Sequence, residues 1–281
     1  MTLQHPDSCK GGNTIPVDKD GRPYHFGANK DEVSNEFLIT SDYYLAEQIS
    51  KLFEEKEPFC FRSNRGYTTF TGHYKGKRLS ICAFGIGFAM IDFLVREVRT
   101  ITKGKLTFIA LGAAPSPAGH ALGTAINIKD AVAYELDFNT FNAENPTPYR
   151  FFKKPVPADE TLFNALNEGL KAANIPHVEG RVASNPSFIS GVNSADINGF
   201  NFKKEGLLQK VEAELGKIDT LEMDTYPLYW TALREVNHDI KTAAISIVNS
   251  DANGHALPVE ELRKRQVEVA AVILEQLGKL Q

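Results

Sequence analysis

The sequence predicts an α/β layered fold built on a largely parallel sheet. Short apolar runs alternate along the chain with segments whose apolar residues recur every three or four positions, which is the spacing of an amphipathic helix. Strands that alternate with helices are typical of a sheet covered by helices. No internal repeat and no linker divides the 281 residues, of which 42% are hydrophobic. We therefore predict one domain over residues 23–281, preceded by a polar and flexible tail over residues 1–22.

The first elements follow from short local patterns. Phe37–Thr40 is an apolar strand, and a helical pattern runs from Tyr44 to Phe53 after it. Two strand-like runs, Tyr67–Tyr74 and Arg78–Phe84, flank a turn with glycine at its centre, so they predict a hairpin.

The later elements follow from the same two patterns: short apolar runs for strands, and apolar residues at three- or four-residue spacing for helices. They are a helix over residues 90–101, a strand over 106–111 that ends in a loop over 112–123, a helix opened by residues 157–160 and running to about 173, a helix over 225–235, a strand over 241–248, and a helix over 259–277.

Composition excludes several classes of partner. A net charge of −4 gives no electrostatic footprint for nucleic acid or for an anionic membrane. Cys9, Cys60 and Cys82 lack the spacing of a metal site, and an odd number of cysteines argues against a disulfide framework. The N-terminus lacks the apolar core of a signal peptide, and no apolar run approaches the roughly 18 residues that span a bilayer. We therefore expect a cytoplasmic protein without a metal or cofactor.

Four polar or glycine-containing segments follow predicted strands. They are Ser41-Asp42, Gly85-Ile86-Gly87, residues 112–123 and Asn249-Ser250-Asp251. In parallel sheets, ligands bind beyond the carboxyl ends of the strands. Gly85 and Gly87 would let backbone amides approach a ligand, although they would equally allow a tight turn into a helix.

An ordered set of motifs resembles the uridine phosphorylase branch of the nucleoside phosphorylase superfamily. The motifs are Tyr24-His25-Phe26-Gly27, Asn64 to Gly72, Phe84 to Gly87, Glu222-Met223-Asp224 and Val248-Asn249, and the resemblance covers residues 24–277. It implies a three-layer fold with a mixed, partly barrel-like central sheet flanked by helices. It also implies a nucleoside substrate, phosphate as co-substrate, and a homodimer or larger assembly that completes its sites across the interface.

The resemblance further implies roles for individual residues around the sugar. His25 resembles a histidine that reaches the ribose 5′-hydroxyl of the neighbouring subunit. Met223 would pack on the ribose, and Glu222 and Asp224 would hold its hydroxyls, with Asp224 accepting from the 2′- and 3′-hydroxyls. A carboxylate near the sugar suits N-glycosidic cleavage, because that reaction passes through an oxocarbenium-like cation.

Other implied roles concern the phosphate and the base. Arg65 resembles the neighbour's phosphate-binding arginine, and the turn Gly85 to Gly87 would lie beside the phosphate. Phe188 resembles an aromatic that lines the base pocket. Asp251 resembles the Ser-Asp of purine-cleaving members, which protonates the leaving base, whereas alignment on Val248-Asn249 places Ser250 there instead.

The chain departs from the family at the phosphate site. Ser41-Asp42-Tyr43-Tyr44-Leu45 replaces a Gly-Asp-Pro-Gly-Arg sequence, and Ala110 to Ala114 lacks an arginine and a threonine. Each charge-assisted hydrogen bond lost in this way removes roughly 1.5–3 kcal/mol. The Gln-x-Arg pair that reads uracil is absent from residues 188–198, and Asp224 replaces a glutamate.

Three functions remain open at this point. The chain is a phosphorylase that relies on Arg65, a nucleosidase in which Asp42 activates water, or a silent nucleoside-binding relative. Asp42 is equally explained as a helix N-cap, Arg65 as a surface ion-pair partner, and Phe188 as a core aromatic. We favour cleavage of a ribonucleoside N-glycosidic bond, with uridine as the default substrate.

Overall fold

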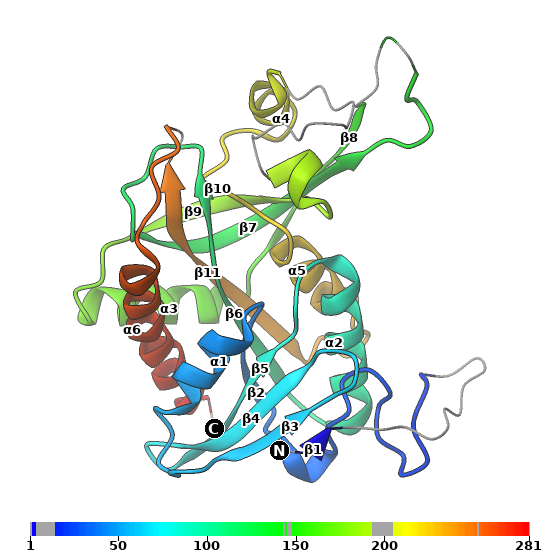
Figure 1. Ribbon diagram of the computed structural model, residues 1–281, viewed down its shortest axis with the longest axis vertical. Coiled ribbons are helices and arrows are strands. Elements are labelled where there is room, and N and C mark those ends of the chain that lie inside the picture. The colour runs from blue at the N-terminus through cyan, green and yellow to red at the C-terminus, as the bar shows by residue number, and fades with distance from the viewer. Residues whose placement is uncertain are drawn as a thin grey trace.

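The computed structural model describes residues 2–3, 15–142, 144, 148–192, 205–251 and 253–280. Within this part of the chain, eleven strands form one mixed sheet (Figure 1). Its order is β1-β3-β4-β5-β2-β6-β11-β7-β9-β10, and β8 pairs with β7 outside this path.

The strands are β1 Thr2–Leu3, β2 Glu36–Thr40, β3 Phe59–Arg62, β4 Thr68–Tyr74, β5 Lys77–Ala83, β6 Leu106–Ser116, β7 Ala125–Leu136, β8 Tyr149–Pro157, β9 His177–Ser184, β10 Thr220–Glu222 and β11 Ile240–Asp251. The helices are α1 Tyr43–Ser50, α2 Phe88–Ile101, α3 Glu160–Ala172, α4 Leu207–Leu215, α5 Thr225–Leu233 and α6 Val259–Gly278, with a 3₁₀ turn η1 Lys30–Glu32 and a π-helical turn η2 Phe188–Val192.

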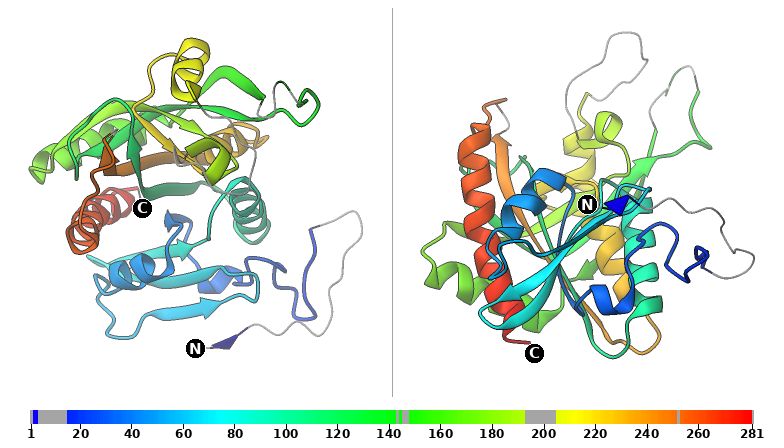
Figure 2. Two further views of the ribbon diagram at one scale, coloured as in Figure 1. Left: turned by 45° about the horizontal axis from the view of Figure 1, so that its top comes forward. Right: turned by 60° about the horizontal axis from the view of Figure 1, so that its bottom comes forward.

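Helices cover both faces of the sheet and make three layers. One apolar core joins the sheet to α1, α3 and α6, through side chains such as Leu45, Leu166 and Ile273. A second joins it to α2 and α5, through Leu94 and Leu228. Figure 2 shows these two groups of helices on opposite sides of the strands from two further directions. A third, smaller cluster packs α4 against β7 and β9. The expected three-layer fold with a mixed central sheet is confirmed.

Parallel pairing gathers several strand ends at one edge of the sheet. β2 lies between β5 and β6 and is parallel to both, with Thr40 opposite Ala83. β11 runs parallel to β6 as far as the pair Asp251 and Ser116. The expectation that the segments after these strands share one edge is therefore confirmed.

Two predicted loop boundaries are wrong. β6 continues to Ser116 and β11 to Asp251, so residues 112–116 and 249–251 are strand and not loop. The two strands stay paired because a register shift between Val248 and Ser250 absorbs one residue. The sheet is also less parallel than expected, since β3, β4 and β5 form an antiparallel meander and β8 pairs antiparallel with β7.

Part of the proposed N-terminal tail makes defined contacts. Val17 bridges to Pro23, and the Arg22 guanidinium lies 2.6 Å from the Glu32 carboxylate. Residues 1 and 4–14, including Cys9, lie outside the described residues, so the limit of a flexible tail stays a prediction. Among the helices that are described, none has the length and apolar character needed to cross a membrane.

Candidate active site

Glu222 caps the helix that follows it. It ends β10, and its Oε2 accepts hydrogen bonds from the backbone N–H of Asp224 at 2.6 Å and of Thr225 at 2.9 Å. Its Oε1 accepts from the hydroxyl of Ser184 at the end of β9. A carboxylate at the start of α5 satisfies orphan N–H groups and suits the helix dipole. Glu222 therefore ends the strand and binds the first N–H groups of the next helix, and its contact with ribose stays a prediction.

Asp224 connects the acid–Met–acid run, Glu222-Met223-Asp224, to the glycine turn after β5. Its Oδ1 accepts from the backbone N–H of Gly87 at 2.6 Å, across 137 positions of sequence. Gly87 has φ +97°, a conformation that favours glycine, and it is the N-cap residue of α2. The predicted ribose and phosphate segments therefore meet in the structure.

The carboxyl groups of Glu222 and Asp224 are partly buried close together, and both have raised pKa values. Burial raises the pKa of Glu222, and burial together with the Glu222 carboxylate raises the pKa of Asp224 to about 8. Among the described residues, Glu222 receives three hydrogen bonds and Asp224 one, so the negative charge of the pair is better stabilised on Glu222. Asp224 is therefore the member of the pair that holds a proton more readily, and a protonated carboxyl group can both donate and accept a hydrogen bond.

A cavity of about 620 Å³ adjoins this run. Phe188 and Asp251 both line it, and so does Leu221, the residue before Glu222. The volume is within the range of small-molecule sites, and the lining combines apolar walls with a few polar groups. The remaining lining residues are Pro115, Ser116, Pro117, Tyr134, Gly191, Val192, Glu205, Gly206, Leu207, Leu208, Gln209, Val211, Asn249, Ser250 and Gly254.

The π-helical turn η2 forms one wall of the cavity and carries Phe188, whose side chain is 49% exposed. The hydroxyl of Tyr134 donates to Gly191 O at 2.9 Å, and that of Tyr149 donates to Ser190 O. These bonds fix η2 against the sheet. The core alternative for Phe188 is therefore wrong, because its ring is half exposed at the cavity. Residues 193–204, which include most of the region searched for a uracil-binding pair, lie outside the described residues.

Asp251 ends β11 and is held by the turn that follows. Its Oδ1 accepts from the backbone N–H of Asn253 and of His255, both at 2.9 Å, and its Oδ2 lies 2.8 Å from His255 Nδ1. The hydrogen bond from His255 lowers the pKa of Asp251. The bulge before Ser250 brings Asp251 level with Ser116 at the cavity. Asp251 is therefore present at the cavity as an ionised acceptor.

Asp42 has both carboxylate oxygens engaged. Oδ1 accepts from the backbone N–H of Leu45 at 3.1 Å, and Oδ2 is ion-paired with Arg263 of α6. The N-cap interpretation is confirmed by the first contact. The catalytic role of Asp42 stays a prediction.

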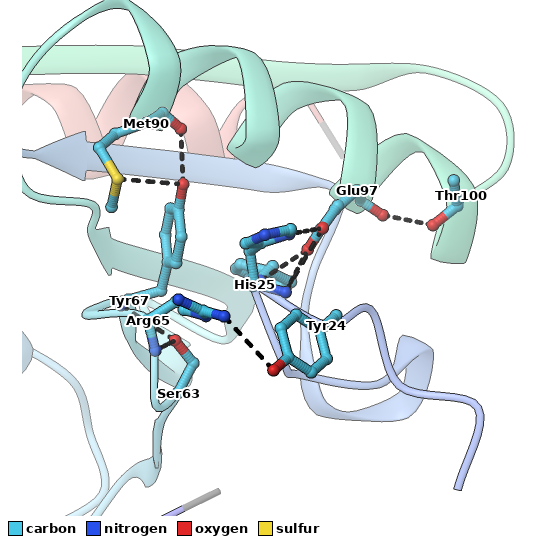
Figure 3. Close-up of polar contacts among 9 residues, drawn as sticks. Tyr24, His25, Ser63, Arg65, Tyr67, Met90, Glu97 and Thr100 are labelled. Atoms are coloured by element: carbon cyan, nitrogen blue, oxygen red, sulfur yellow. Dashed lines mark hydrogen bonds and ion pairs between the residues drawn. The ribbon is translucent and has the colours of Figure 1, made fainter. Parts of the chain in front are cut away.

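His25 and Arg65 lie in one surface cluster (Figure 3). Tyr24 connects them, since the Arg65 guanidinium lies 5.1 Å from its ring centre and 3.4 Å from its hydroxyl, while the ring meets that of His25 edge to face. Among the described residues, no hydrogen bond or ion pair joins this cluster to Glu222–Asp224. Asp224 is thus hydrogen-bonded to the glycine turn at Gly87, whereas His25 and Arg65 contact a different set of residues.

Comparison with known proteins places the chain in a family. A sequence model of the phosphorylase superfamily matches residues 37–278. The chain belongs to the phosphorylase superfamily. A uridine phosphorylase of Thermococcus kodakarensis is 27% identical over 218 residues, which is 77% of this chain and 74% of the relative. A DeoD-type purine nucleoside phosphorylase of Thermoanaerobacter is 25% identical over 252 residues, 89% of this chain and 97% of the relative.

Solved structures of the superfamily share the fold. One from a study of two uridine phosphorylases of the oomycete Phytophthora capsici superposes with a TM-score of 0.90 at 23% identity, covering 96% of this chain and 99% of that one. The purine nucleoside phosphorylase of Toxoplasma gondii gives a TM-score of 0.70 at 18% identity, covering 96% of this chain and 98% of that one.

Three contacts of the site had no signal in the sequence. Ser184 binds Glu222, Glu97 binds His25, and Arg263 binds Asp42. Ser184 ends β9, a strand that the sequence patterns did not predict, so its place at a strand end gave no signal either. Within the described residues, no group of three or more His, Cys, Asp or Glu side chains is arranged to hold a metal ion.

Proposed function

We propose that this protein cleaves the N-glycosidic bond of a ribonucleoside with inorganic phosphate as the nucleophile. The bond between C1′ of ribose and the base nitrogen breaks, a bond between C1′ and a phosphate oxygen forms, and the base leaves with the proton that hydrogen phosphate supplies. The reaction would serve nucleoside salvage in the cytoplasm.

The observation that carries the proposal is the position of the acid–Met–acid run. Asp224 is bonded to the glycine turn at Gly87, and Leu221 lines the cavity that also contains Phe188. A ribose between these groups would have Met223 against its carbon face and Asp224 at its hydroxyls. A base in the cavity would then contact Phe188.

The contacts of Asp42 favour phosphate over water as the nucleophile. A residue that activates water needs a free oxygen to take the proton. Capping of α1 and the ion pair with Arg263 occupy both oxygens of Asp42. Arg65 supplies a cation for the phosphate, because its exposed guanidinium has no acidic partner among the described residues.

Uridine is the substrate that we propose to test first. Proton donation to a departing purine would require a protonated acid at the base, and the bond from His255 keeps Asp251 ionised. An ionised Asp251 can instead accept a hydrogen bond from an N–H group, which uracil offers. The name of the Thermococcus relative supports the same choice.

A second copy of this chain would complete the site. His25 and Arg65 share no hydrogen bond or ion pair with Asp224 in the part of the chain that the structure describes. This is expected of residues that contact the substrate in the site of a second subunit. An aromatic surface of α2, α5 and β8 is available for such contact: Tyr226 packs on Phe88 at 6.4 Å and on Phe152 at 6.2 Å between ring centres, and Trp230 is 42% exposed beside them on α5. We therefore expect a homodimer or a larger assembly.

The test measures release of base from uridine, inosine and adenosine, each with and without phosphate. We expect uracil and ribose 1-phosphate to form from uridine only when phosphate is present. Met223→Ala and Asp224→Ala should each reduce kcat/KM at least tenfold, or about 1.4 kcal/mol. Asp159→Ala, at the N-cap of α3, is the control that should leave kcat/KM unchanged.

Two results would contradict the proposal. Release of base without phosphate would identify a nucleosidase, and Asp42→Asn would then be the next variant. A rise in Tm with nucleoside but no release of base would identify a nucleoside-binding relative without activity.

A further inference from the structure

Glu97 is a buried carboxylate in the middle of α2. Only 1% of the residue is exposed. Charged side chains are almost never fully buried without partners, because an ionised group loses its hydration there. The partners of Glu97 therefore indicate what the residue does.

Within the described part of the chain, the Glu97 carboxylate binds two adjacent residues that are far away in the sequence. Its Oε2 accepts from the backbone N–H of Phe26 at 2.6 Å and of His25 at 3.0 Å. Its Oε1 lies 2.6 Å from His25 Nδ1 (Figure 3). A carboxylate is an acceptor only, so the hydrogen of this last bond belongs to Nδ1.

The imidazole is fixed on its other sides as well. Its ring stacks on Phe93, one turn before Glu97, with ring centres 3.9 Å apart and planes at 22°. Tyr24 meets it edge to face at 5.3 Å. Within the described residues, Nε2 has no hydrogen-bond partner, and the side chain of His25 is 18% exposed. The bond at Nδ1 thus determines which nitrogen remains for a ligand.

We propose that Glu97 is a positioning residue for His25. It holds the proton on Nδ1, sets the plane of the imidazole against Phe93, and presents Nε2 to the substrate. The functional consequence rests on the proposed function, in which His25 contacts the ribose. The same logic applies wherever a carboxylate orients a functional histidine: the bond at one nitrogen sets the tautomer and leaves the other nitrogen for chemistry.

A purely structural role of Glu97 would not require its hydrogen bond to the His25 imidazole. The two backbone bonds to His25 and Phe26 already attach the N-terminal segment to α2. The hydrogen bond to Nδ1 is not needed to hold the N-terminal segment on α2, because the backbone N–H groups of His25 and Phe26 already do so. It does restrict the ring, and this restriction can be tested separately.

The first experiment reads the tautomer directly and needs no activity. The protein is labelled with 15N-histidine, and the His25 signals are assigned by their loss in His25→Ala. In the wild-type protein we expect the Nδ1-protonated form. In Glu97→Gln the amide oxygen keeps the backbone bonds, but the amide N–H must face Nδ1, so we expect the proton to move to Nε2. Asp92→Asn, an exposed partner of Arg96 in the same helix, is the matched control and should change nothing.

The second experiment is a double-mutant cycle on kcat/KM for the nucleoside. Loss of the partner that orients a functional histidine costs about 10- to 100-fold at metal sites, and we expect the low end, about tenfold, for Glu97→Gln. The loss should vanish in the His25→Ala background, because Glu97 acts through the imidazole. Circular dichroism and Tm confirm that each variant is folded, and Glu97→Asp supplies a second variant that retains the charge.

The outcomes separate this proposal from the function on which it rests. Unchanged His25 signals in Glu97→Gln, or an equal loss of activity with and without His25, would overturn the positioning role. A tautomer that depends on Glu97, together with full activity of His25→Ala, would uphold the positioning role and overturn only the ribose contact.

Discussion

At the scale of residues, Glu222 and Asp224 show how a two-residue spacing produces two different environments. Glu222 accepts three hydrogen bonds at the start of α5, whereas Asp224 accepts one from Gly87. Two carboxyl groups so close do not both ionise readily, so a proton stays with the group whose negative charge accepts fewer hydrogen bonds. Asp224 is that group, and a sugar hydroxyl would supply the contact that it lacks.

This protonation state predicts a pH dependence of stability. The pKa of Asp224 lies near 8 in the folded protein against an ordinary value of 3.8, so the folded state binds more protons between these values. The associated stability is fully present below about pH 4 and is lost as the pH rises to about 8. Asp224→Asn removes this titration. Between pH 5 and pH 8, we expect the free energy of unfolding of the variant to rise by about 1–3 kcal/mol relative to that of the wild type. The gain is smaller than the full pKa shift of Asp224 would give, because solvent partly screens the charges of the pair.

Urea unfolding at a series of pH values measures this difference. Asp92→Asn serves as the control, because its carboxylate is exposed and lies outside the Glu222–Asp224 pair. An Asp224→Asn variant whose stability ran parallel to wild type over the whole range would show that Asp224 is ionised in the folded protein at neutral pH.

Sequence reasoning identified these residues but not their partners. The carboxylates bracketing Met223 are visible in a linear motif, since all three lie within three positions. Ser184, Glu97 and Arg263 approach the site across 38 to 221 positions, and hydrogen bonds at such separations leave no periodic pattern in a single sequence. For the same reason, the sequence predicted that Asp42 caps a helix but not that it pairs with Arg263.

At the scale of elements, strand ends were harder to predict than strands. The apolar run Leu106–Leu111 marks β6, but the strand continues through the small residues Gly112 to Ala114 because β11 supplies hydrogen bonds to Ser116. Pairing partners, and not local composition, determine where such a strand stops. β7 and β9 had no assignment from the sequence. The helices at 90–101 and 259–277 were found within two residues of their ends, because long amphipathic periods are the strongest local signal.

The start of α5 offers a test of an element that also carries function. Glu222→Ala removes acceptors for two backbone N–H groups and for Ser184, so we expect the free energy of unfolding to fall by about 1–3 kcal/mol. The rise in Tm produced by nucleoside should also be lost, because the same residue orients Asp224. Asp159→Ala removes the equivalent cap from α3, where Asp159 accepts from Leu162 N–H at 3.0 Å. It should cost about 1 kcal/mol and leave the nucleoside effect intact. Loss of the nucleoside effect in both variants would mean that the effect reports general stability.

The turn η2 offers a second test. A Cβ atom at Gly191 would lie 2.1 Å from Cγ of Asn185, which is fully buried, so neither side can give way easily. We expect Gly191→Ala to cost about 1–3 kcal/mol and to displace the wall that carries Phe188. The KM for nucleoside should rise more than kcat falls. An unchanged KM in a folded variant would place the base outside this cavity.

At the scale of the whole molecule, the sequence predicted the layers and the family better than the connectivity. Alternating strands and helices indicate a covered sheet, and the ordered motifs indicate the superfamily whose model matches residues 37–278. That the sheet is mixed follows from the antiparallel partners of β4 and β8, which depend on contacts between distant segments. The separation of His25 and Arg65 from Asp224 is likewise visible only in three dimensions.

This separation leads to a test of whether two copies share a site. In a dimer whose sites each combine His25 of one subunit with Met223 of the other, His25→Ala damages both sites, and so does Met223→Ala. A mixed dimer of the two variants has one site with both defects and one with neither. After dissociation and random reassociation of equal amounts, half of the dimers are mixed, so about a quarter of the sites are intact. We therefore expect two weakly active variants to recover about a quarter of wild-type activity when reassembled together. If both residues served the same subunit's site, every site in the mixture would keep one defect, and the activity would stay at the average of the two variants.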